Sequence, residues 1–389
     1  MRVAFAYRNL NRSGSLERDA VLLLEGLVRR GVELHCYCDP GTSVDVDGVV
    51  RRDVHPVTRS RSRLGYPLLR GSFAYRATRA LRADREQFDL VHVLGVSAWE
   101  NDVVHVPAVM AAERARWPGR GGVGYRAARA RARLAPVLRP EVGVVNVIER
   151  LQFRSGRYLR VTAVTEQVRD DLARVHGIPP DRITVVPPPV EVARFRGARD
   201  GRLRSDLAVE PDAQVLLFVG HAFERKGLSD VIAALAACSP IVHLVVVGGG
   251  DRTAYERKAV ELGLGARIHF VGSVDKPEEY YAAADLVVLP TRSDPWGIPV
   301  IEAMAAGVPV VTTEAAGSGS LAARAGAAVL VPPRAPGPLA DAIGDLLSDP
   351  HRRREMGERG KAEARRFDVS AVADATLAVY ERALAERRA

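Results

Sequence analysis

Residues 289–313 read LPTRSDPWGIPVIEAMAAGVPVVTT, and this stretch indicates the fold class. It begins at the end of a short apolar segment, Leu286–Pro290, which is typical of a strand buried in a parallel sheet. A turn rich in Ser, Asp, Pro and Gly follows, then a helix that Gly307 ends, then a second strand at Val308–Val311. Because strand, helix and strand alternate, we expect the turn at the carboxyl edge of a parallel sheet, where α/β proteins bind ligands.

Two carboxylates in this stretch, Asp294 and Glu302, are separated by seven residues. The first is expected in the turn and the second on the helix, so that both can face one cleft. The sequence around them resembles the retaining GT-B glycosyltransferases of family 4, which carry Glu-x7-Glu followed by Ala-Met-Ala-x-Gly-x-Pro-Val. Residues 302–310 match this pattern, whereas the first acid of the pair is Asp and not Glu.

The resemblance implies an α/β fold of the GT-B type, in which two Rossmann-like domains face each other across a cleft. We accordingly expect an acceptor-binding domain over residues 1–190, a linker over 191–212 and a nucleotide-sugar-binding domain over 213–367. A last helix over 368–389 would cross back to the N-terminal domain. The pattern of residues 49–70 is irregular and basic, and we expect helices at 72–85 and 341–367.

A second turn that could bind a ligand is Gly220–Gly227, GHAFERKG, which lies between an expected strand and an expected helix. An arginine can grip a diphosphate through two parallel hydrogen bonds, a lysine adds a point charge, and a helix N-terminus favours an anion. The turn resembles the family's phosphate motif Gly-x-x-x-x-Arg-Lys-Gly. The resemblance implies that Arg225 and Lys226 hold the diphosphate of the donor.

The first half of the chain carries weaker signals. The run Gly14-Ser15-Leu16-Glu17-Arg18-Asp19 resembles the Gly-Gly-Leu-Gln-Arg-Asp of the lipopolysaccharide-core glucosyltransferase branch, although Ser15 replaces a glycine. The resemblance implies that Gly14, Ser15 and Asp19 lie near the donor, and that a histidine reaches its sugar. His105 is the best candidate and His92 the fallback, but a histidine in an apolar strand also fits a structural role. The remaining donor-binding residues that the resemblance implies are Gly220, Val274, Gly297, Ile298, Pro299 and Glu302.

The resemblance implies transfer of a sugar from a nucleotide diphosphate donor to a hydroxyl, with retention at the anomeric carbon. Arg225 and Lys226 would stabilise the leaving diphosphate without a metal, so we expect neither metal nor cofactor. Glu302 would bind the ribose and Asp294 the donor sugar, with UDP-hexose or UDP-N-acetylhexosamine as donor and a saccharide or small metabolite as acceptor. Two alternatives stay open: a non-catalytic nucleotide-sugar-binding protein, and a phosphosugar-accepting synthase or phosphorylase, which needs an extra basic cluster over the acceptor pocket.

Composition limits the location and the partners. The length of 389 residues predicts two or three domains, and the hydrophobic content of 47% is enough to bury a sizeable core. No run approaches the roughly 20 apolar residues of a membrane span. We find no signal-peptide pattern, and three cysteines without a disulfide framework fit the cytoplasm. The net charge of +9 gathers at residues 51–85 and 114–139. Because no aromatic residues lie between these arginines in a way that suggests base stacking, we expect no nucleic-acid partner. The basic clusters then form either a solvated surface or a peripheral contact with the anionic inner face of the membrane.

Overall fold

The computed structural model describes residues 1–12, 15–60, 62, 64–116, 140–154, 158–197, 204–205, 210 and 212–388. The chain folds as two compact units. The first unit is formed by Met1–Pro189 together with Val369–Ala389, and the second by Val190–Asp368. Across the described ranges, no helix is both long and apolar enough to cross a membrane.

The first unit is built on a parallel sheet of seven strands in the order β3-β2-β1-β4-β5-β6-β7. Its strands are β1 (Arg2–Ala6), β2 (Glu33–Cys38), β3 (Val49–Asp53), β4 (Leu90–Leu94), β5 (Val103–Val106), β6 (Arg160–Ala163) and β7 (Ile183–Val185). Its α-helices in the described ranges are α1 (Ser15–Val28), α2 (Gly65–Ala83), α3 (Met110–Arg116), α5 (Pro140–Arg154), α6 (Glu166–His176) and α17 (Val369–Arg388). The strand order reverses between β1 and β4, which makes their carboxyl ends the switch point of this sheet.

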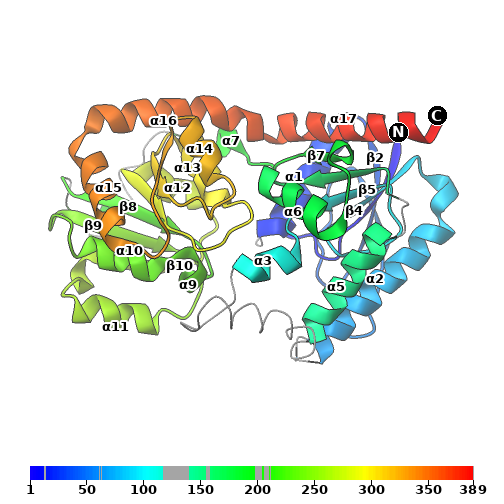
Figure 1. Cartoon of the computed structure of the whole chain (residues 1–389), viewed down its shortest axis with the longest axis horizontal. Helices are drawn as coiled ribbons and strands as arrows, with labels where there is room; N and C mark the ends of the chain where they lie inside the picture. Colours follow the sequence, from blue (N-terminus) through cyan, green and yellow to red (C-terminus); the bar gives the residue numbers. More distant parts are fainter. Residues whose placement is uncertain are drawn as a thin grey trace. The chain divides into compact units, whose positions relative to one another are not determined.

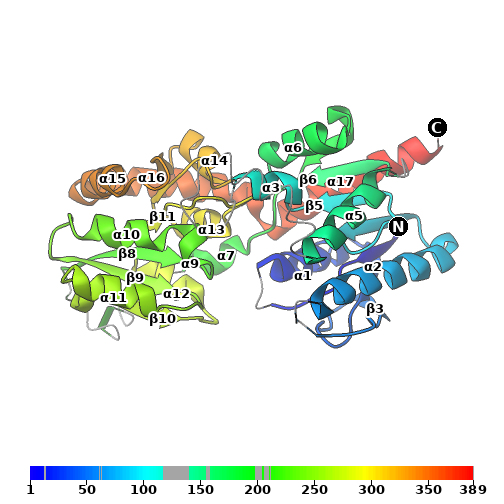
Figure 2. The same cartoon turned by 60° about the horizontal axis from the view of Figure 1, so that its bottom comes forward.

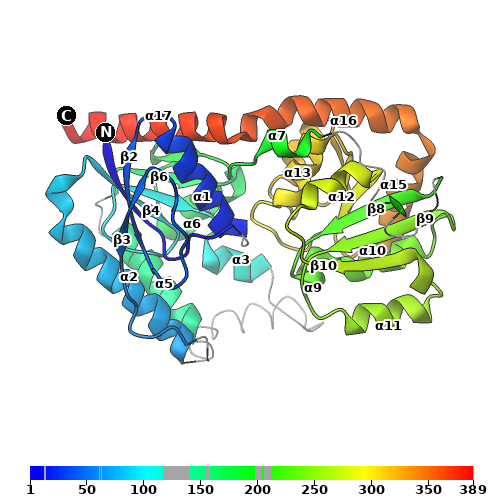
Figure 3. The same cartoon turned by 180° about the vertical axis from the view of Figure 1, so that it is seen from behind.

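Alternating side chains of β1 face two different layers of helices. Val3 and Phe5 belong to the cluster under α1 and α17, whereas Ala4 and Ala6 pack with residues of α2. Helix α17 lies along α1 (Figure 3), and α2 lies beside α5 (Figure 2). The last helix of the chain therefore completes the core of the first unit.

The second unit contains a parallel sheet of six strands in the order β10-β9-β8-β11-β12-β13. The strands are β8 (Gln214–Val219), β9 (Val242–Val247), β10 (Ile268–Gly272), β11 (Leu286–Leu289), β12 (Val310–Thr312) and β13 (Ala328–Leu330). The α-helices in the described ranges are α7 (Val192–Phe195), α9 (Phe223–Lys226), α10 (Leu228–Leu235), α11 (Thr253–Glu261), α12 (Pro277–Ala283), α13 (Ile298–Ala306), α14 (Gly319–Arg324), α15 (Pro336–Ser348) and α16 (Pro350–Ala364). Figure 1 shows α12 and α13 on one side of this sheet and α10 and α11 on the other. The order reverses between β8 and β11, which defines a second switch point.

Three local expectations were wrong. The stretch expected to be irregular contains strand β3, whose side chains are mostly exposed because it is an edge strand, so the hydrophobic pattern was weak. Helix α2 begins at Gly65, earlier than the expected residue 72. The expected helix 341–367 is two helices, because Asp349 caps α16 by accepting from the Arg352 N–H (2.9 Å) and a proline follows it.

Candidate active site

In the second unit, the turn after β8 and the loop after β11 are joined through their backbones. Gly227 has φ of 84° and separates α9 from α10. A Cβ atom at this position would lie 2.3 Å from the Pro290 carbonyl oxygen, so only glycine permits the approach. The Arg292 N–H and the Thr291 hydroxyl both donate to the Arg225 carbonyl oxygen (2.8 and 3.1 Å). The two predicted binding segments therefore meet at the carboxyl ends of β8 and β11, at the switch point.

The charged groups of these two segments form one cluster. Lys226 is 7% exposed, and its Nζ donates to Oδ2 of Asp294. Arg225 Nη1 lies 3.5 Å from the same oxygen and donates to the Ser293 carbonyl (2.5 Å). Burial acts to raise the pKa of the Asp294 carboxyl, but the charges of Lys226 and Arg225 outweigh it and the pKa is lowered. Asp294 is thus an ionised acid between two cations, and the cluster carries a net positive charge suited to an anion.

Glu302 lies in the middle of the following helix, α13. Gly297, with φ of 86°, is the N-cap residue of α13, and its carbonyl oxygen accepts from the Ser318 hydroxyl (3.1 Å). The Glu302 side chain is 3% exposed, and its Oε2 accepts a hydrogen bond from the Tyr281 hydroxyl (2.7 Å). Such a buried, bonded carboxylate is restrained in orientation, as a ligand for hydroxyl groups requires.

The other predicted donor-binding residues of the second unit lie at the following places in the fold. Gly220 lies against the stem of Lys226, since a Cβ added to it would be 3.2 Å from the lysine Cγ. Ile298 and Pro299 are the first residues of α13. Val274 follows β10 and packs on the core of the unit. Their roles as ligands stay predictions.

In the first unit, Asp19 and His105 line the same small cavity, together with the proline run Pro187–Pro189. Its volume is about 20 Å³, roughly the space of one water. His105 is 7% exposed, its Nδ1 is 2.8 Å from the Thr162 hydroxyl, and burial lowers its pKa to about 4. Asp19 and His105 therefore both face a small enclosed cavity, and the His105 imidazole is neutral at pH 7.

The remaining predictions for the first unit have different outcomes. Ser15 begins α1, whereas Gly14 lies outside the described residues. The fallback His92 is fully buried, and its Nδ1 is 2.6 Å from the hydroxyl of Tyr380 on α17. That contact fits the structural role that an apolar strand predicts for a lone histidine.

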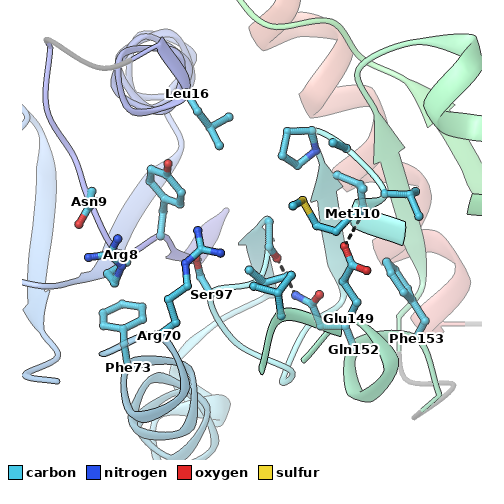
Figure 4. A pocket seen from close by; sticks show the side chains of 18 of the residues that line it. Arg8, Asn9, Leu16, Arg70, Phe73, Ser97, Met110, Glu149, Gln152 and Phe153 are labelled. Atoms are coloured by element: carbon cyan, nitrogen blue, oxygen red, sulfur yellow. Dashed lines mark hydrogen bonds between the residues drawn. The ribbon is translucent and has the colours of Figure 1, made fainter. Parts of the chain in front are cut away.

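Sequence reasoning missed the larger cavity of the first unit, which has a volume of about 540 Å³ (Figure 4). It opens at the carboxyl ends of β1, β4 and β5, at the switch point of the sheet, and its size is typical of small-molecule sites. The residues of its polar lining are Tyr7, Arg8, Asn9, Glu17, Tyr66, Arg70, Ser97, Glu149, Gln152 and His176. One available signal was the Tyr-Arg-Asn sequence directly after β1.

The sequence contains one Asp-x-Asp pattern, Asp45-Val46-Asp47. Such a pattern can hold a divalent metal ion between phosphates, so it bears on the expectation that the protein needs no metal. Asp45 forms an ion pair with Arg51 of β3 (2.6 Å), and its side chain is 82% exposed. Neither aspartate lines the cavities described above. Throughout the ranges that the structure covers, no group of three or more His, Cys, Asp or Glu side chains is arranged to hold a metal ion.

Both halves of the chain match family models. Residues 16–194 match the model described as Glycosyltransferase Family 4, and residues 201–363 match the model described as Glycosyl transferases group 1. The two matches together span most of the chain and separate near the expected linker.

Curated relatives include several named D-inositol 3-phosphate glycosyltransferases. The protein of Segniliparus rotundus is 31% identical over 307 residues, which cover 75% of this chain and 68% of the relative. That of Kineococcus radiotolerans is 29% identical and is matched over 97% of this chain and 92% of its own length. The second such protein of Catenulispora acidiphila is 36% identical over 245 residues, but the match covers 59% of this chain and only 57% of the relative.

Solved structures share the fold. The lipopolysaccharide biosynthesis glycosyltransferase WaaG superposes with a TM-score of 0.77 at 21% identity, over 97% of this chain and 99% of its own. Sucrose-phosphate synthase of Thermosynechococcus elongatus gives 0.78 at 21% identity, over 99% of each chain. HepE of Anabaena in complex with UDP-glucose gives 0.71 at 18%, over 97% of this chain and 99% of its own. These likenesses confirm the predicted GT-B fold class, with its two Rossmann-like units.

Proposed function

Because the chain belongs to the group 1 and family 4 glycosyltransferases, we propose that it transfers a sugar from a UDP-sugar to a hydroxyl group, with retention of the anomeric configuration. The observation that carries the proposal is the cluster of Arg225, Lys226 and Asp294 at the switch point of the second unit. Ligands of α/β sheets bind at such points, and this one presents two cations to an anion.

In the proposed reaction, the bond between the anomeric carbon and the diphosphate breaks and negative charge grows on the diphosphate. Arg225 and Lys226 hold that charge more strongly in the transition state than in the ground state, which lowers the barrier. A metal ion is not needed in this scheme, because the two side chains supply the positive charge. Asp294 holds hydroxyls of the donor sugar and fixes its pose, and Glu302 accepts hydrogen bonds from the ribose.

Retention follows in this proposal from reaction on a single face of the sugar. The acceptor hydroxyl attacks the face that the diphosphate leaves, and the departing phosphate oxygen takes the proton of that hydroxyl. The new glycosidic bond therefore keeps the configuration of the broken one. No side chain has to act as a nucleophile.

The acceptor is proposed to bind in the cavity of the first unit, whose polar lining suits a molecule with several hydroxyl groups. The relatives are named for action on D-inositol 3-phosphate, and an inositol or sugar of similar size is a fitting candidate here. The alternative of a non-catalytic nucleotide-sugar-binding protein is disfavoured. Such a protein does not need Arg225 and Lys226 to stabilise the charge of a transition state, yet both residues are present.

A thermal-shift screen of nucleotide diphosphate sugars tests the donor assignment. A UDP-sugar is expected to raise the melting temperature, since it binds the native state only. The shift should be smaller in Arg225→Ala than in Arg252→Ala, whose exposed arginine pairs with Glu256 on α11. NMR of the glycoside formed from the active donor then gives its anomeric configuration, and an inverted product would contradict the proposal.

A further inference from the structure

Two arginines converge on the cavity of the first unit from separate elements. Arg8 is the second residue after β1, and Arg70 projects from α2. Figure 4 shows both guanidinium groups on the same side of the cavity. Burial lowers the pKa of Arg8, and the positive charge of Arg70 lowers it further. Two like charges thus lie within electrostatic reach of each other in a partly desolvated place, an arrangement that costs free energy unless an anion is present.

Neither arginine has a carboxylate partner within the described ranges. The guanidinium of Arg70 lies over the Tyr66 ring, 5.3 Å from its centroid, and no ion pair of Arg8 or Arg70 is found among the described residues. Neighbouring arginines of the unit differ: Arg59 pairs with the fully buried Asp39 (2.9 Å) and Arg85 with Asp102 (2.9 Å). Asp39, the acid that acts on Arg8, is therefore already neutralised. Arg8 and Arg70 keep their hydrogen-bond donors for a ligand.

Among the described residues, the acids that line the cavity form no ion pair with Arg8 or Arg70. Glu149, on the opposite side of the cavity in Figure 4, accepts from the Met110 N–H (3.3 Å) and lies 3.8 Å from His176. Glu17 belongs to α1 and forms no ion pair with either arginine. The cavity thus has one cationic wall and one wall of hydrogen-bonding groups, which matches a molecule with an anionic end and a hydroxyl-bearing body.

We infer that Arg8 and Arg70 form an anion subsite, so that the acceptor carries a phosphate or carboxylate group beside its hydroxyls. This inference rests on the proposed function and narrows its acceptor class. Arg8 and Arg70 would then be the basic cluster over the acceptor pocket that a phosphosugar-accepting enzyme requires. Arginine suits the role because its planar donors match the oxygens of either anion in pairs.

Isothermal titration of the full-length protein tests the subsite without turnover. The probes are D-inositol 3-phosphate against inositol, and glucuronate against glucose, each pair differing in its anionic group. We expect the anionic member of at least one pair to bind and its neutral partner to bind at least about 10-fold more weakly. Binding of the anion should also weaken as salt is added.

Variants connect the affinity to the two side chains. Arg8→Gln and Arg70→Gln should each weaken anion binding by about 10-fold to 100-fold. Arg79→Gln is the matched control, because Arg79 lies on the same helix, is exposed, and stacks over Tyr75 (6.0 Å). Circular dichroism of each variant shows whether the fold is kept.

Three outcomes would overturn the inference. The first is equal affinity for anionic and neutral probes, and the second is unchanged anion affinity in both folded arginine variants. The third is displacement of the bound anion by UDP in Arg225→Ala, which would assign Arg8 and Arg70 to the donor. Failure of the donor assignment is distinguishable, because UDP would then produce no heat while the anionic probe still binds.

Discussion

The ammonium group of Lys226 donates to the carboxylate of Asp294 across 68 residues of sequence. The cation belongs to the turn after β8 and the acid to the loop after β11. The lysine that is predicted to bind the diphosphate and the aspartate that is predicted to bind the donor sugar therefore form one ion pair. A donor that binds here shares Lys226 with Asp294, so a change in either residue alters the other.

Loss of the cationic side chains should reduce the rate more than it reduces donor affinity. Arg225→Ala or Lys226→Ala removes a charge-assisted contact of about 2–4 kcal/mol, which corresponds to roughly 30-fold to 1000-fold in kcat. Steady-state kinetics with the active UDP-sugar measure this effect, with Arg252→Ala as control. Near-normal turnover in both variants would place the phosphate site elsewhere.

Asp294→Asn should destabilise the protein and change its response to acid. Removing one partner of a buried ion pair costs about 3–5 kcal/mol at pH 7. The pKa of Asp294 is lowered in the folded state, so its stabilising contribution is complete above the ordinary aspartate pKa of about 3.9 and is lost as pH falls through the lowered value. Urea unfolding at pH 7 and below about pH 4 should therefore show a smaller acid effect in the variant than in the wild type.

The exposed Asp341→Asn on α15 serves as the control for Asp294, since it removes an acid from the same unit without a buried partner. Equal stability losses for the two variants would show that the Lys226 pair contributes nothing specific.

His105 should make the protein less stable as the pH falls from about 6.5 towards 4. Its folded pKa of about 4 lies below the ordinary value, so the unfolded chain binds the proton first and the free energy of unfolding decreases in this window. The contribution amounts to about 3 kcal/mol over the full window. His105→Gln should flatten the curve of unfolding free energy against pH. The buried His92, whose pKa is also lowered by burial, would account for a remaining slope.

Turnover should persist after treatment with EDTA, because Arg225 and Lys226 supply the positive charge that a metal would otherwise provide. The measurement is the rate of UDP release before and after removal of divalent ions. Activity that is lost and then restored by magnesium or manganese alone would contradict the expectation and direct attention to Asp45 and Asp47.

The basic clusters leave two alternatives open, a solvated surface and contact with an anionic membrane. If they contact a membrane, liposomes with anionic lipids should bind the protein at low salt and release it as salt screens the charges. Arg76→Gln combined with Arg79→Gln, on the exposed side of α2, should weaken this binding. Equal binding to neutral and anionic liposomes, or none at low salt, would favour a solvated surface.

Local sequence pattern was sufficient for the elements that surround the predicted donor site. The apolar run of β11, the turn residues before α13 and the glycines at 297 and 307 specify a strand, a loop and a helix by short-range sterics alone. The same pattern did not predict β3, whose side chains are mostly exposed, or the start of α2, where Gly65, Pro67 and Gly71 are poor helix formers.

The sequence by itself determined the fold class, and it predicted the turn Gly220–Gly227, Asp294 and Glu302 as donor-binding groups, because these predictions depend on residue types at fixed short spacings. Only the tertiary structure decided which groups meet. It paired Lys226 with Asp294 and Tyr281 with Glu302, enclosed His105 beside Thr162, and brought Arg8 of the β1 end to the same cavity as Arg70 of α2. The physical reason is that parallel strands distant in sequence end at one edge of a sheet, so the charges there converge through topology and packing.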